Sequence, residues 1–244
     1  MTLAALPGVP EVRPGDDLAA LLAAAAERLD GGLRAGDVLA VAHKVVSKSE
    51  GRTVRLAHVT PGAEARRLAD EHGKDPRLVQ VVLGESAELV RADRGRLIAR
   101  TRHGFVCANA GVDASNAGAS DTLILLPEDP DASARRLRAA LGCAVVVTDS
   151  FGRPWRMGQC EVAIGSAGLA PVEDWRGRAD ADGRELAVTA IAIADEAAAA
   201  ADLARGKDTR EPAIRIRGLE RHVMGADGPG AAALVRSLED DLFR

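Results

Sequence analysis

The sequence predicts an α/β fold in which strands alternate with helices. Short apolar runs rich in β-branched residues alternate with Ala-rich helical patterns along most of the 244 residues. Such alternation is typical of an α/β layer. The strongest predicted strand is 144–148, which follows a predicted helix and ends in polar residues. We expect one unit over 1–244 with two candidate subdomains: an α/β body of about 1–150 together with 186–244, and a smaller inserted portion of about 151–185.

Composition argues against two kinds of partner. Tyr is absent and aromatic residues make up 2% of the chain, which leaves little for stacking on nucleic-acid bases. The formal charge of −4 lacks the basic surplus that a phosphate backbone requires. No apolar run approaches the roughly 18 residues of a membrane span, and no basic segment precedes Pro7. We therefore expect neither nucleic-acid nor membrane partners.

The three cysteines, Cys107, Cys143 and Cys160, are widely spaced and form no CxxC pair. This pattern argues against a disulfide framework and against a thiolate zinc site. We expect reduced thiols and a cytoplasmic location. Cys107, Cys160 and His103 are expected to have structural roles, since the chemistry considered below needs no His or Cys nucleophile.

The first predicted elements are an extended segment, a helix and a strand. Prolines punctuate residues 6–15, where no helix can begin. Asp16 and Asp17 then offer an N-cap to an Ala/Leu-rich helix that ends near a Gly-Gly pair. Residues 37–42 form an apolar strand, and the segment 43–52, rich in hydrogen-bond donors, follows its tip.

Lys44 and Lys48 stand four residues apart in this segment, with Ser47 between them. A helical turn would direct both ammonium groups to one side, and a strand would align them through its period of two. The sequence leaves both geometries open, and either would create a cationic spot. The alternative is a pair of solvated surface lysines.

The middle of the chain is predicted to contain two surface helices followed by short strands. Residues 62–91 have helical patterning that is interrupted at Asp75 and Pro76, where a second helix begins. Two strand-like runs, 96–101 and 104–107, come next.

The remaining elements continue the alternation of strands and helices to the C-terminus. They are, in order, a strand over 123–126, a helix over 128–142, an apolar run over 162–168, a polar loop over 175–186, a strand over 187–193, a helix over 195–205, a charged loop over 206–212, a strand over 214–217 and a tail helix that runs to 244.

Residues 108–118 form a loop of small residues that carries Asp113, two asparagines and a serine. Its glycines let backbone amides approach a ligand. The chain contains neither GxxxxGK[ST] nor a GxGxxG after a strand, which excludes these phosphate-binding motifs. One interpretation is an oxygen-ligand site in which Asp113 and Asp149, from two loops, bind a hard divalent cation. The alternative is that both aspartates stabilise turns.

The most informative stretch is DSFGRPWR, residues 149–156, directly after the predicted strand 144–148. Strand tips carry ligand sites in α/β proteins, because the strand is rigid and the following loop can reach into a cleft. Arg153 and Arg156 flank Trp155, and two guanidinium groups beside an indole suit a planar, anionic ligand. The alternative is a turn-capping aspartate and a Trp that fills the core.

Several strings spread over 6–218 carry a family resemblance. They are VVSKSEGR, TRHGFVCANAGVDASN, LLPEDPDASARRLR, TDSFGRPWR, VAIGSAG and ADEAAAAADLARGK. Together they resemble the coenzyme F420:γ-L-glutamate ligases. The resemblance implies a two-part α/β fold of that family's type with mixed sheets and flanking helices, unrelated to P-loop or ATP-grasp ligases.

The resemblance also implies an activity. Members are GTP-dependent, metal-requiring enzymes that add L-glutamate to the lactyl end of the deazaflavin precursor F420-0 and then extend a γ-linked oligoglutamate tail. It implies small-molecule partners (F420-0, L-glutamate and GTP), Mg²⁺ or Mn²⁺ as two divalent ions, K⁺ as a further candidate, and a homodimer with the nucleotide near the dimer cleft. We expect the stand-alone form, without the nitroreductase-like domain to which some members are fused.

Residue roles follow from the same resemblance. Asp113 and Asp149 correspond to ligands of a first metal, and Ser150 corresponds to a hydroxyl on a second metal. Nucleotide contacts would fall on Val9, Pro10, Glu11, Val12, His43, Lys44, Lys48, Asn116, Gly206, Lys207 and Asp208.

Lys207 departs from the family pattern. Members with an acidic metal ligand in this loop carry it next to the glycine, where this chain has Lys207. Two alternatives are open: Asp208 replaces that ligand, or the second metal relies on water and phosphate oxygens.

The residues and the resemblance indicate one chemistry. Amide formation from a carboxylate requires activation, and an acyl phosphate supplies it by γ-phosphoryl transfer. Our hypothesis is that Asp113 and Asp149 hold the ions that bridge the GTP phosphates and that Lys48 stabilises the phosphates. Arg153 and Arg156 would hold the acceptor's phosphodiester or the incoming glutamate. Two alternatives are a same-fold glutamate ligase for a different carboxylate acceptor and a non-catalytic nucleotide- or metal-binding protein.

Overall fold

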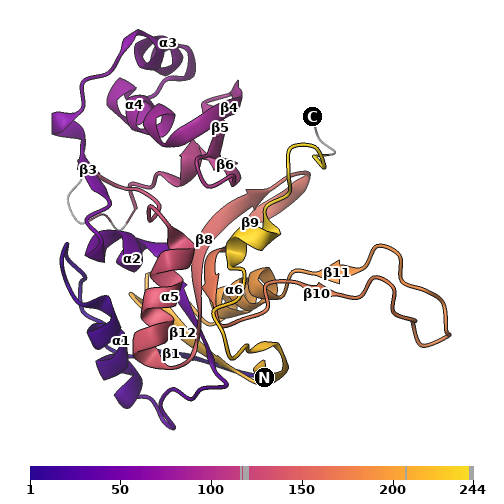
Figure 1. Cartoon of the computed structure of the whole chain (residues 1–244). Helices are drawn as coiled ribbons and strands as arrows, with labels where there is room; N and C mark the ends of the chain where they lie inside the picture. The colour runs from indigo at the N-terminus through magenta and orange to yellow at the C-terminus, as the bar shows by residue number, and fades with distance from the viewer. Residues whose placement is uncertain (116, 118–120, 207, 242–244) are drawn as a thin grey trace.

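A five-stranded mixed sheet forms the centre of the body in Figure 1, and it confirms the predicted mixed α/β fold. The computed structural model describes residues 1–115, 117, 121–206 and 208–241. The strand order is β1-β12-β2-β8-β9; β2 and β8 are parallel, whereas the other neighbouring pairs are antiparallel. The strands are β1 (Thr2–Ala5), β2 (Val38–Ala42), β8 (Ala144–Arg153), β9 (Arg156–Ala167) and β12 (Ala213–Arg217).

The central pair, β2 and β8, is buried on both faces. Leu39 and Val41 pack into one hydrophobic cluster with α1 (Leu18–Glu27) and α5 (Pro130–Leu141). Val38 and Ala40 alternate with them and pack into a second cluster with α6 (Ile193–Leu203). Because successive side chains of a strand point to opposite faces, a continuous apolar run is what such a doubly covered strand requires.

Local capping signals begin the covering helices where the sequence predicts them. Asp17 accepts a hydrogen bond from the Ala20 amide at 3.0 Å at the start of α1, and Asp129 accepts one from the Ala132 amide at 2.8 Å at the start of α5. α2 (His43–Ser49) follows β2 directly. The helical geometry for Lys44 and Lys48 is therefore the correct one of the two alternatives.

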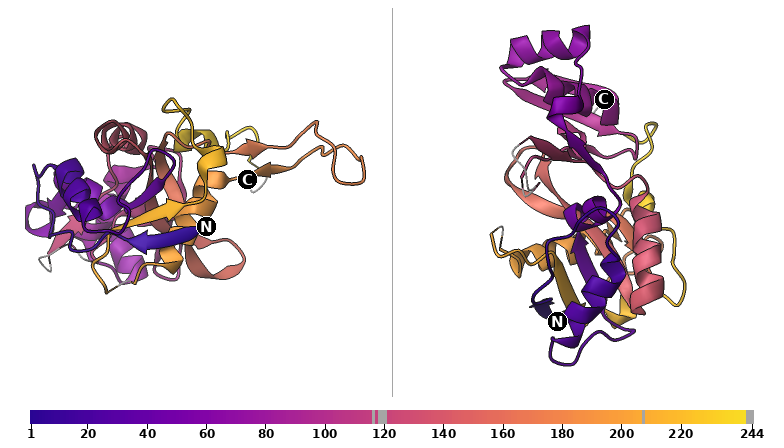
Figure 2. Two further views of the ribbon diagram at one scale, coloured as in Figure 1. Left: turned by 90° about the horizontal axis from the view of Figure 1, so that it is seen from below. Right: turned by 90° about the vertical axis from the view of Figure 1, so that its left-hand side faces the viewer.

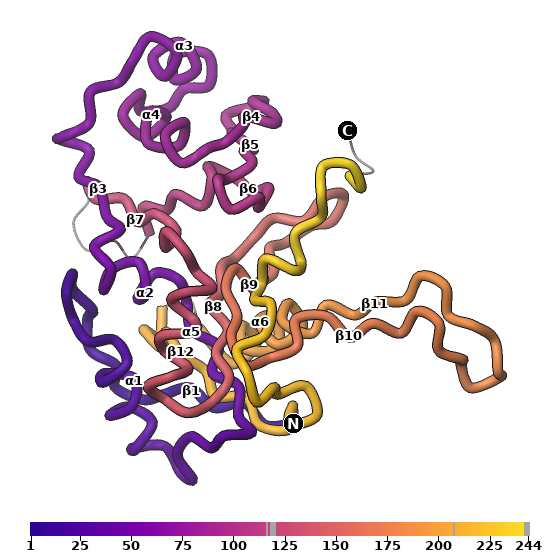
Figure 3. Tube along the Cα trace, in the orientation of Figure 1, coloured from indigo at the N-terminus to yellow at the C-terminus, as the bar shows by residue number. Residues whose placement is uncertain are grey.

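A second lobe with its own hydrophobic cluster lies above the main sheet in Figures 1 and 3. Two helices pack there against a three-stranded antiparallel sheet, and a two-stranded ladder connects the lobe to the body. Its elements are α3 (Ala63–His72), α4 (Pro76–Glu85), β4 (Ser86–Asp93), β5 (Arg96–Thr101), β6 (Val106–Ala108), β3 (Thr53–Arg55) and β7 (Thr122–Ile124).

The predicted break between two helices at Asp75 and Pro76 is confirmed. Asp75 accepts a hydrogen bond from the Arg77 amide at 2.8 Å and caps α4. The helical patterning expected as far as 91 was wrong beyond Glu85, because the chain there enters β4 and pairs with β5.

The β8–β9 hairpin extends the main sheet beyond its core. Residues 151–185, expected as a smaller inserted portion, include β9, an edge strand of the main sheet. They also include the first half of an arm formed by β10 (Glu173–Asp174) and β11 (Ala190–Ile191), which projects from the body in Figures 1 and 2.

The strand predicted over 187–193 was wrong for most of its length. Only Ala190–Ile191 pair as a strand, and α6 already begins at Ile193. Val188 is 87% exposed, because this segment returns along the arm and has no core to pack against.

The tail helix predicted to run to 244 was wrong over the described residues. The tail contains two short 3₁₀ turns, η3 (Glu220–His222) and η4 (Ala231–Leu234). Similar turns, η1 (Leu56–His58) and η2 (Asn109–Gly111), lie earlier in the chain. The Asp131 side chain accepts hydrogen bonds from the Ala231 and Ala232 amides at 2.7 and 3.2 Å, which holds the tail against the start of α5. Within the part of the chain that the structure describes, no helix has the length and apolarity to cross a membrane.

An ion pair fixes the end of the sheet opposite the loops discussed below. Asp37, which is 1% exposed, receives two hydrogen bonds of 2.7 Å from the Arg217 guanidinium. Burial opposes ionisation, but Arg217 and the Arg34 amide together hold the pKa of Asp37 below its ordinary value. The start of β2 is thereby tied to the end of β12.

Gly165 tests the packing of β9 against α5. A methyl group there would overlap the backbone carbonyl of Pro130, and backbone cannot rotate away as a side chain can. We expect Gly165→Ala to lower the free energy of unfolding by about 1–3 kcal/mol, measured by denaturant titration. The control is Gly84→Ala in α4, where nothing lies within 4 Å. There, added helix propensity should raise stability by up to about 1 kcal/mol; equal effects of both changes would contradict this packing.

Candidate functional site

β2 ends at Ala42 beside β8, which continues beyond this point to Arg153. The prediction that Asp149 follows the strand in a loop was therefore wrong, because Asp149 lies within β8 and pairs with Val162 of β9. Ala42 is in register with Thr148, so the next residues, His43 and Asp149, lie side by side. His43 Nε2 is 3.3 Å from Asp149 Oδ1, and His43 Nδ1 is 3.3 Å from Ser47 Oγ. The His43 side chain is only 2% exposed. It therefore forms a fixed support behind the Asp149 carboxylate.

Asp113 is held opposite Asp149 by an unusual backbone path. Asn109, Ala110 and Gly111 have successive φ values of 53°, 54° and 73°. For Ala110 the left-handed conformation costs about 1–2 kcal/mol. Beyond this turn, Asp113 exchanges two backbone hydrogen bonds, of 3.0 and 2.8 Å, with Ile124. The strained turn ends at a residue whose backbone is fixed, which is typical of a functional loop.

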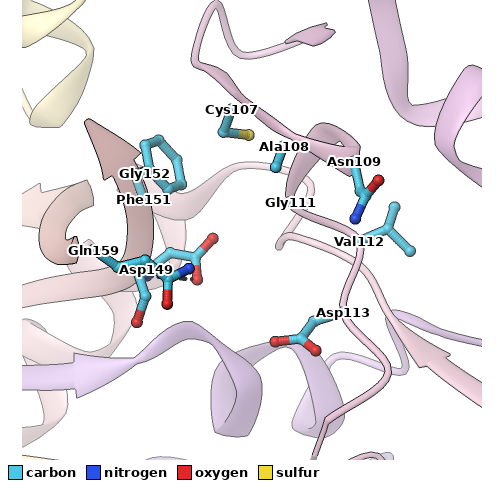
Figure 4. A pocket seen from close by; sticks show the side chains of 11 residues that line it. Cys107, Ala108, Asn109, Gly111, Val112, Asp113, Asp149, Phe151, Gly152 and Gln159 are labelled. Carbon is cyan, nitrogen blue, oxygen red and sulfur yellow. Dashed lines mark hydrogen bonds between the residues drawn. The ribbon is translucent and has the colours of Figure 1, made fainter. Parts of the chain in front are cut away.

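A pocket of about 220 Å³ lies between these two segments. Figure 4 shows Asp113 and Asp149 on opposite sides of it, with the Asp113 carboxylate directed toward the Asp149 side. The lining residues are Cys107, Ala108, Asn109, Gly111, Val112, Asp113, Asp149, Ser150, Phe151, Gly152 and Gln159.

Lys44 connects α2 to Asp113. Its Nζ is 2.6 Å from Asp113 Oδ2 and also donates to Ser115 Oγ. The Ser115 amide donates to Asp113 Oδ1 at 2.6 Å. Burial opposes ionisation of Asp113, but the Lys44 ammonium and the Ser115 amide outweigh it and lower the pKa of the carboxyl. Asp113 is therefore an anion at neutral pH.

The predicted nucleotide segments converge near the end of β2. The Leu6 amide donates to the Ala213 carbonyl at 2.9 Å, which brings 9–12 close to the start of β12. The Ala42 amide donates to the Pro212 carbonyl at 2.8 Å, which brings the 206–212 loop to the end of β2.

The residues predicted to contact the nucleotide lie in different environments. Glu11 forms an ion pair with Lys48, whose side chain is 11% exposed. Val12 is buried, and Val9 packs against the hydrophobic cluster that includes α1 and α5. Pro10, Gly206 and Asp208 lie in loops and are not among the residues that line the pocket. Asn116 and Lys207 lie outside the described residues.

Glu161 is a site residue that sequence reasoning missed. It lies opposite Ser150 in the hairpin, is 5% exposed, and accepts a hydrogen bond from Ser150 Oγ at 2.5 Å. Arg205 Nη2 lies 3.9 Å from Glu161 Oε2 and 3.4 Å from Thr148 Oγ1. A hairpin symmetric about Pro154 and Trp155 would instead pair Ser150 with Gln159. The two-residue register shift between Gly152 and Arg153 places Glu161 opposite Ser150.

Arg153 and Arg156 lie outside the pocket lining, paired with each other near the hairpin tip. Arg153 Nη2 donates to the Met157 carbonyl at 2.7 Å. Trp155 is 83% exposed, so the alternative that it fills the core was wrong.

Cys107 lines the pocket but is poorly suited to be a nucleophile. Burial, together with the negative charge of Asp149, raises the pKa of its thiol to about 12. A thiol at neutral pH is protonated under these conditions and is chemically inert. This agrees with the structural role expected for it.

The donor atoms of the pocket fit a hard cation. Asp113 and Asp149 supply carboxylates and Ser150 supplies a hydroxyl. Among the residues that the structure describes, no three or more His, Cys, Asp or Glu side chains gather as a metal cage. Mg²⁺ is commonly bound by only one or two protein carboxylates, because it keeps several waters and takes substrate phosphates as further ligands. Two carboxylates in this pocket match that requirement.

Fold and site together define a mixed α/β protein with an oxygen-rich pocket beside β8 of its main sheet, approached by lysines of α2. The sequence profile of the F420-0:Gamma-glutamyl ligase family matches residues 8–218. The chain belongs to this family.

Curated relatives are similar over nearly their whole lengths, and each carries the name Coenzyme F420:L-glutamate ligase. The protein of Methanopyrus kandleri is 47% identical over 96% of this chain and 94% of its own length. The protein of Methanothermobacter thermautotrophicus is 44% identical over 100% of this chain and 99% of its own length. The protein of Natronomonas pharaonis is 47% identical over 100% of this chain and 95% of its own length.

Proposed function

We propose that this protein is a GTP-dependent ligase that joins L-glutamate to F420-0 through an amide bond and then extends a γ-linked glutamate tail. Family membership and the names of the relatives support glutamate ligation to F420. The observation that carries the nucleotide and metal parts is the convergence of Asp113 and Asp149 on one pocket, near the end of β2, where α2 and the 206–212 loop also meet.

The proposed reaction proceeds through an acyl phosphate. The γ-phosphoryl group of GTP moves to the acceptor carboxylate, which leaves GDP. The glutamate amine then attacks the acyl carbon; the C–N bond forms, the bond to the phosphate oxygen breaks, and inorganic phosphate leaves. Charge stabilisation and positioning supply most of the catalysis in such phosphoryl transfers.

The chain's own residues provide this positioning. Asp113, Asp149 and Ser150 would hold Mg²⁺ or Mn²⁺, which when bound neutralises phosphate charge. Lys44 pairs with Asp113 at 2.6 Å, so a cation on that carboxylate would compete with the ammonium and release it toward the phosphates. Lys48 lies on the same helix as Lys44 and pairs with Glu11 of the N-terminal segment, and it would bind a phosphate in the same way.

Further parts of the proposal rest on family resemblance. A second ion would take Ser150 together with either Asp208 or water and phosphate oxygens. K⁺ is a further candidate ion, the assembly would be a homodimer, and the location would be cytoplasmic. Arg153 and Arg156 would bind the acceptor or the incoming glutamate.

Mass spectrometry tests the reaction. Purified protein is incubated with F420-0, L-glutamate, Mg²⁺ and either GTP or ATP. We expect products that increase by glutamate-sized mass steps with GTP only. Glutamate addition to other carboxylates, but not to F420-0, would support a ligase with a different acceptor. GTP binding without any product would support a non-catalytic nucleotide-binding protein.

Two substitutions test the metal assignment. Asp113→Asn and Asp149→Asn should each lower Mg²⁺-dependent phosphate release about a hundredfold or more, because a lost carboxylate ligand costs several kcal/mol of transition-state stabilisation. The control is Asp174→Asn on the projecting arm, where the carboxylate binds Arg176. The control should retain normal activity, and near-normal activity in either pocket variant would refute the assignment.

A further inference from the structure

We propose that Phe105 and Phe151 are positioning residues, whose contact between the second lobe and the body sets the distance between the two walls of the pocket. Asp113 lies on one wall and Asp149 on the other. This role rests on the proposed function and deepens it, because the distance matters only if the two carboxylates share one cation.

The two rings meet between segments that belong to different lobes. Phe105 lies in the turn between β5 and β6 of the second lobe, whereas Phe151 lies in β8 of the main sheet. Their centroids are 6.2 Å apart and their planes are inclined at 65°, which is the edge-to-face geometry that aromatic pairs prefer. Both side chains pack against the hydrophobic cluster that includes α1 and α5. The second lobe therefore places an aromatic ring against the core of the body.

Hydrogen bonds hold the Phe105 turn in place from both sides. Within the turn, the Thr101 amide donates to the Phe105 carbonyl at 2.8 Å, and the Phe105 amide donates to Thr101 Oγ1 at 3.1 Å. His103 stacks on Phe105 with a centroid distance of 5.7 Å. Its Nε2 lies 2.9 Å from the Pro127 carbonyl oxygen and 3.1 Å from that of Glu128, just before α5. Because a carbonyl oxygen only accepts, Nε2 carries the proton and ties the turn to the body.

Each ring is close along the chain to one of the two carboxylates. Asp149 and Phe151 are two residues apart in β8, so they share a face of the strand, and both line the pocket. On the other wall, Phe105 leads through β6, which contains the lining residue Cys107, to Asp113. Figure 4 shows Phe151 near Asp149, with Cys107 on the segment that leads to Asp113. A shift of one ring against the other would therefore move one carboxylate relative to the other.

The spacing matters because a small cation tolerates little error in ligand distance. Mg²⁺ takes oxygen ligands at about 2.0–2.1 Å, so two carboxylates share it only when their separation is closely fixed. Lys44 of α2 also links the body to Asp113, but a cation on that carboxylate would displace the ammonium. The contact between Phe105 and Phe151 carries no charge and would persist when the ion binds.

Manganese binding tests this role without any need for turnover. Phe151→Leu keeps an apolar side chain but removes the edge-to-face contact. Mn²⁺ is titrated into the protein, and the free ion is measured by electron paramagnetic resonance. We expect the Kd for Mn²⁺ to rise about tenfold or more, which is the usual effect of losing a residue that orients metal ligands. An unchanged Kd would overturn the inference.

A control variant separates positioning from a general loss of stability. Leu141, the last residue of α5, packs against the same hydrophobic cluster but precedes the start of β8, at the end of the strand remote from Asp149. Leu141→Ala should lower the denaturation midpoint and leave the Kd for Mn²⁺ unchanged. An equal rise of the Kd in Leu141→Ala and Phe151→Leu would show that destabilisation alone weakens the site, and would contradict the proposed role.

A double-mutant cycle tests whether the two rings act through each other. If their contact is what sets the spacing, Phe105→Leu should weaken Mn²⁺ binding about as much as Phe151→Leu does. The double variant should then bind Mn²⁺ no more weakly than either single variant. Effects that multiply in the double variant would mean that each ring acts independently, which the proposed contact does not allow.

The two proposals fail separately. Weaker Mn²⁺ binding in Phe151→Leu, in a protein that adds no glutamate to F420-0, would support the positioning contact and refute the ligase reaction. Glutamate addition together with an unchanged Kd for Mn²⁺ in Phe151→Leu would support the ligase reaction and refute the positioning contact. Wild-type Mn²⁺ affinity in Asp113→Asn would refute the shared cation and, with it, the role of the two rings.

Discussion

The parallel pairing of β2 with β8 is the constraint on which the rest of the site depends. The register that aligns Ala42 with Thr148 brings His43 beside Asp149 and begins α2 at the edge of the pocket. Because the pair is buried between α1 and α5 on one face and α6 on the other, a shift of one residue would turn every apolar side chain to the wrong cluster. The same burial that stabilises the sheet therefore fixes the positions of the charged groups at its end.

Local sequence signals were sufficient for the elements that supply the site. The short β-branched run at 144–148 predicted the central strand, and aspartates at 17 and 75 predicted helix starts that the structure confirms. Lys44 and Lys48 lie on a helix, and each forms an ion pair with a carboxylate in the described structure. Asp113 and Asp149 were both predicted to lie in loops; Asp149 instead lies within β8, and both residues line one pocket.

Features that depend on distant contacts could not be predicted from the sequence. Glu161 faces Ser150 only because the hairpin register shifts between Gly152 and Arg153, and no pattern of apolar residues encodes that shift. Residues 187–193 form an almost continuous apolar run typical of a strand, yet most of them run along an arm that leaves the core. The tail is held by the Asp131 side chain instead of by helical hydrogen bonds, a contact between residues 100 positions apart. In each case tertiary structure overrides a local preference.

In the proposed mechanism, Asp113 and Asp149, from segments far apart in the sequence, hold one divalent cation together beside the nucleotide. Anomalous diffraction from crystals grown with Mn²⁺ and GTP would locate this metal without reference to activity. We expect a manganese peak within coordination distance of both carboxylates and of a phosphate oxygen. A peak on only one of the two carboxylates, or a bound nucleotide with its metal elsewhere, would refute the assignment of both aspartates as ligands of one ion.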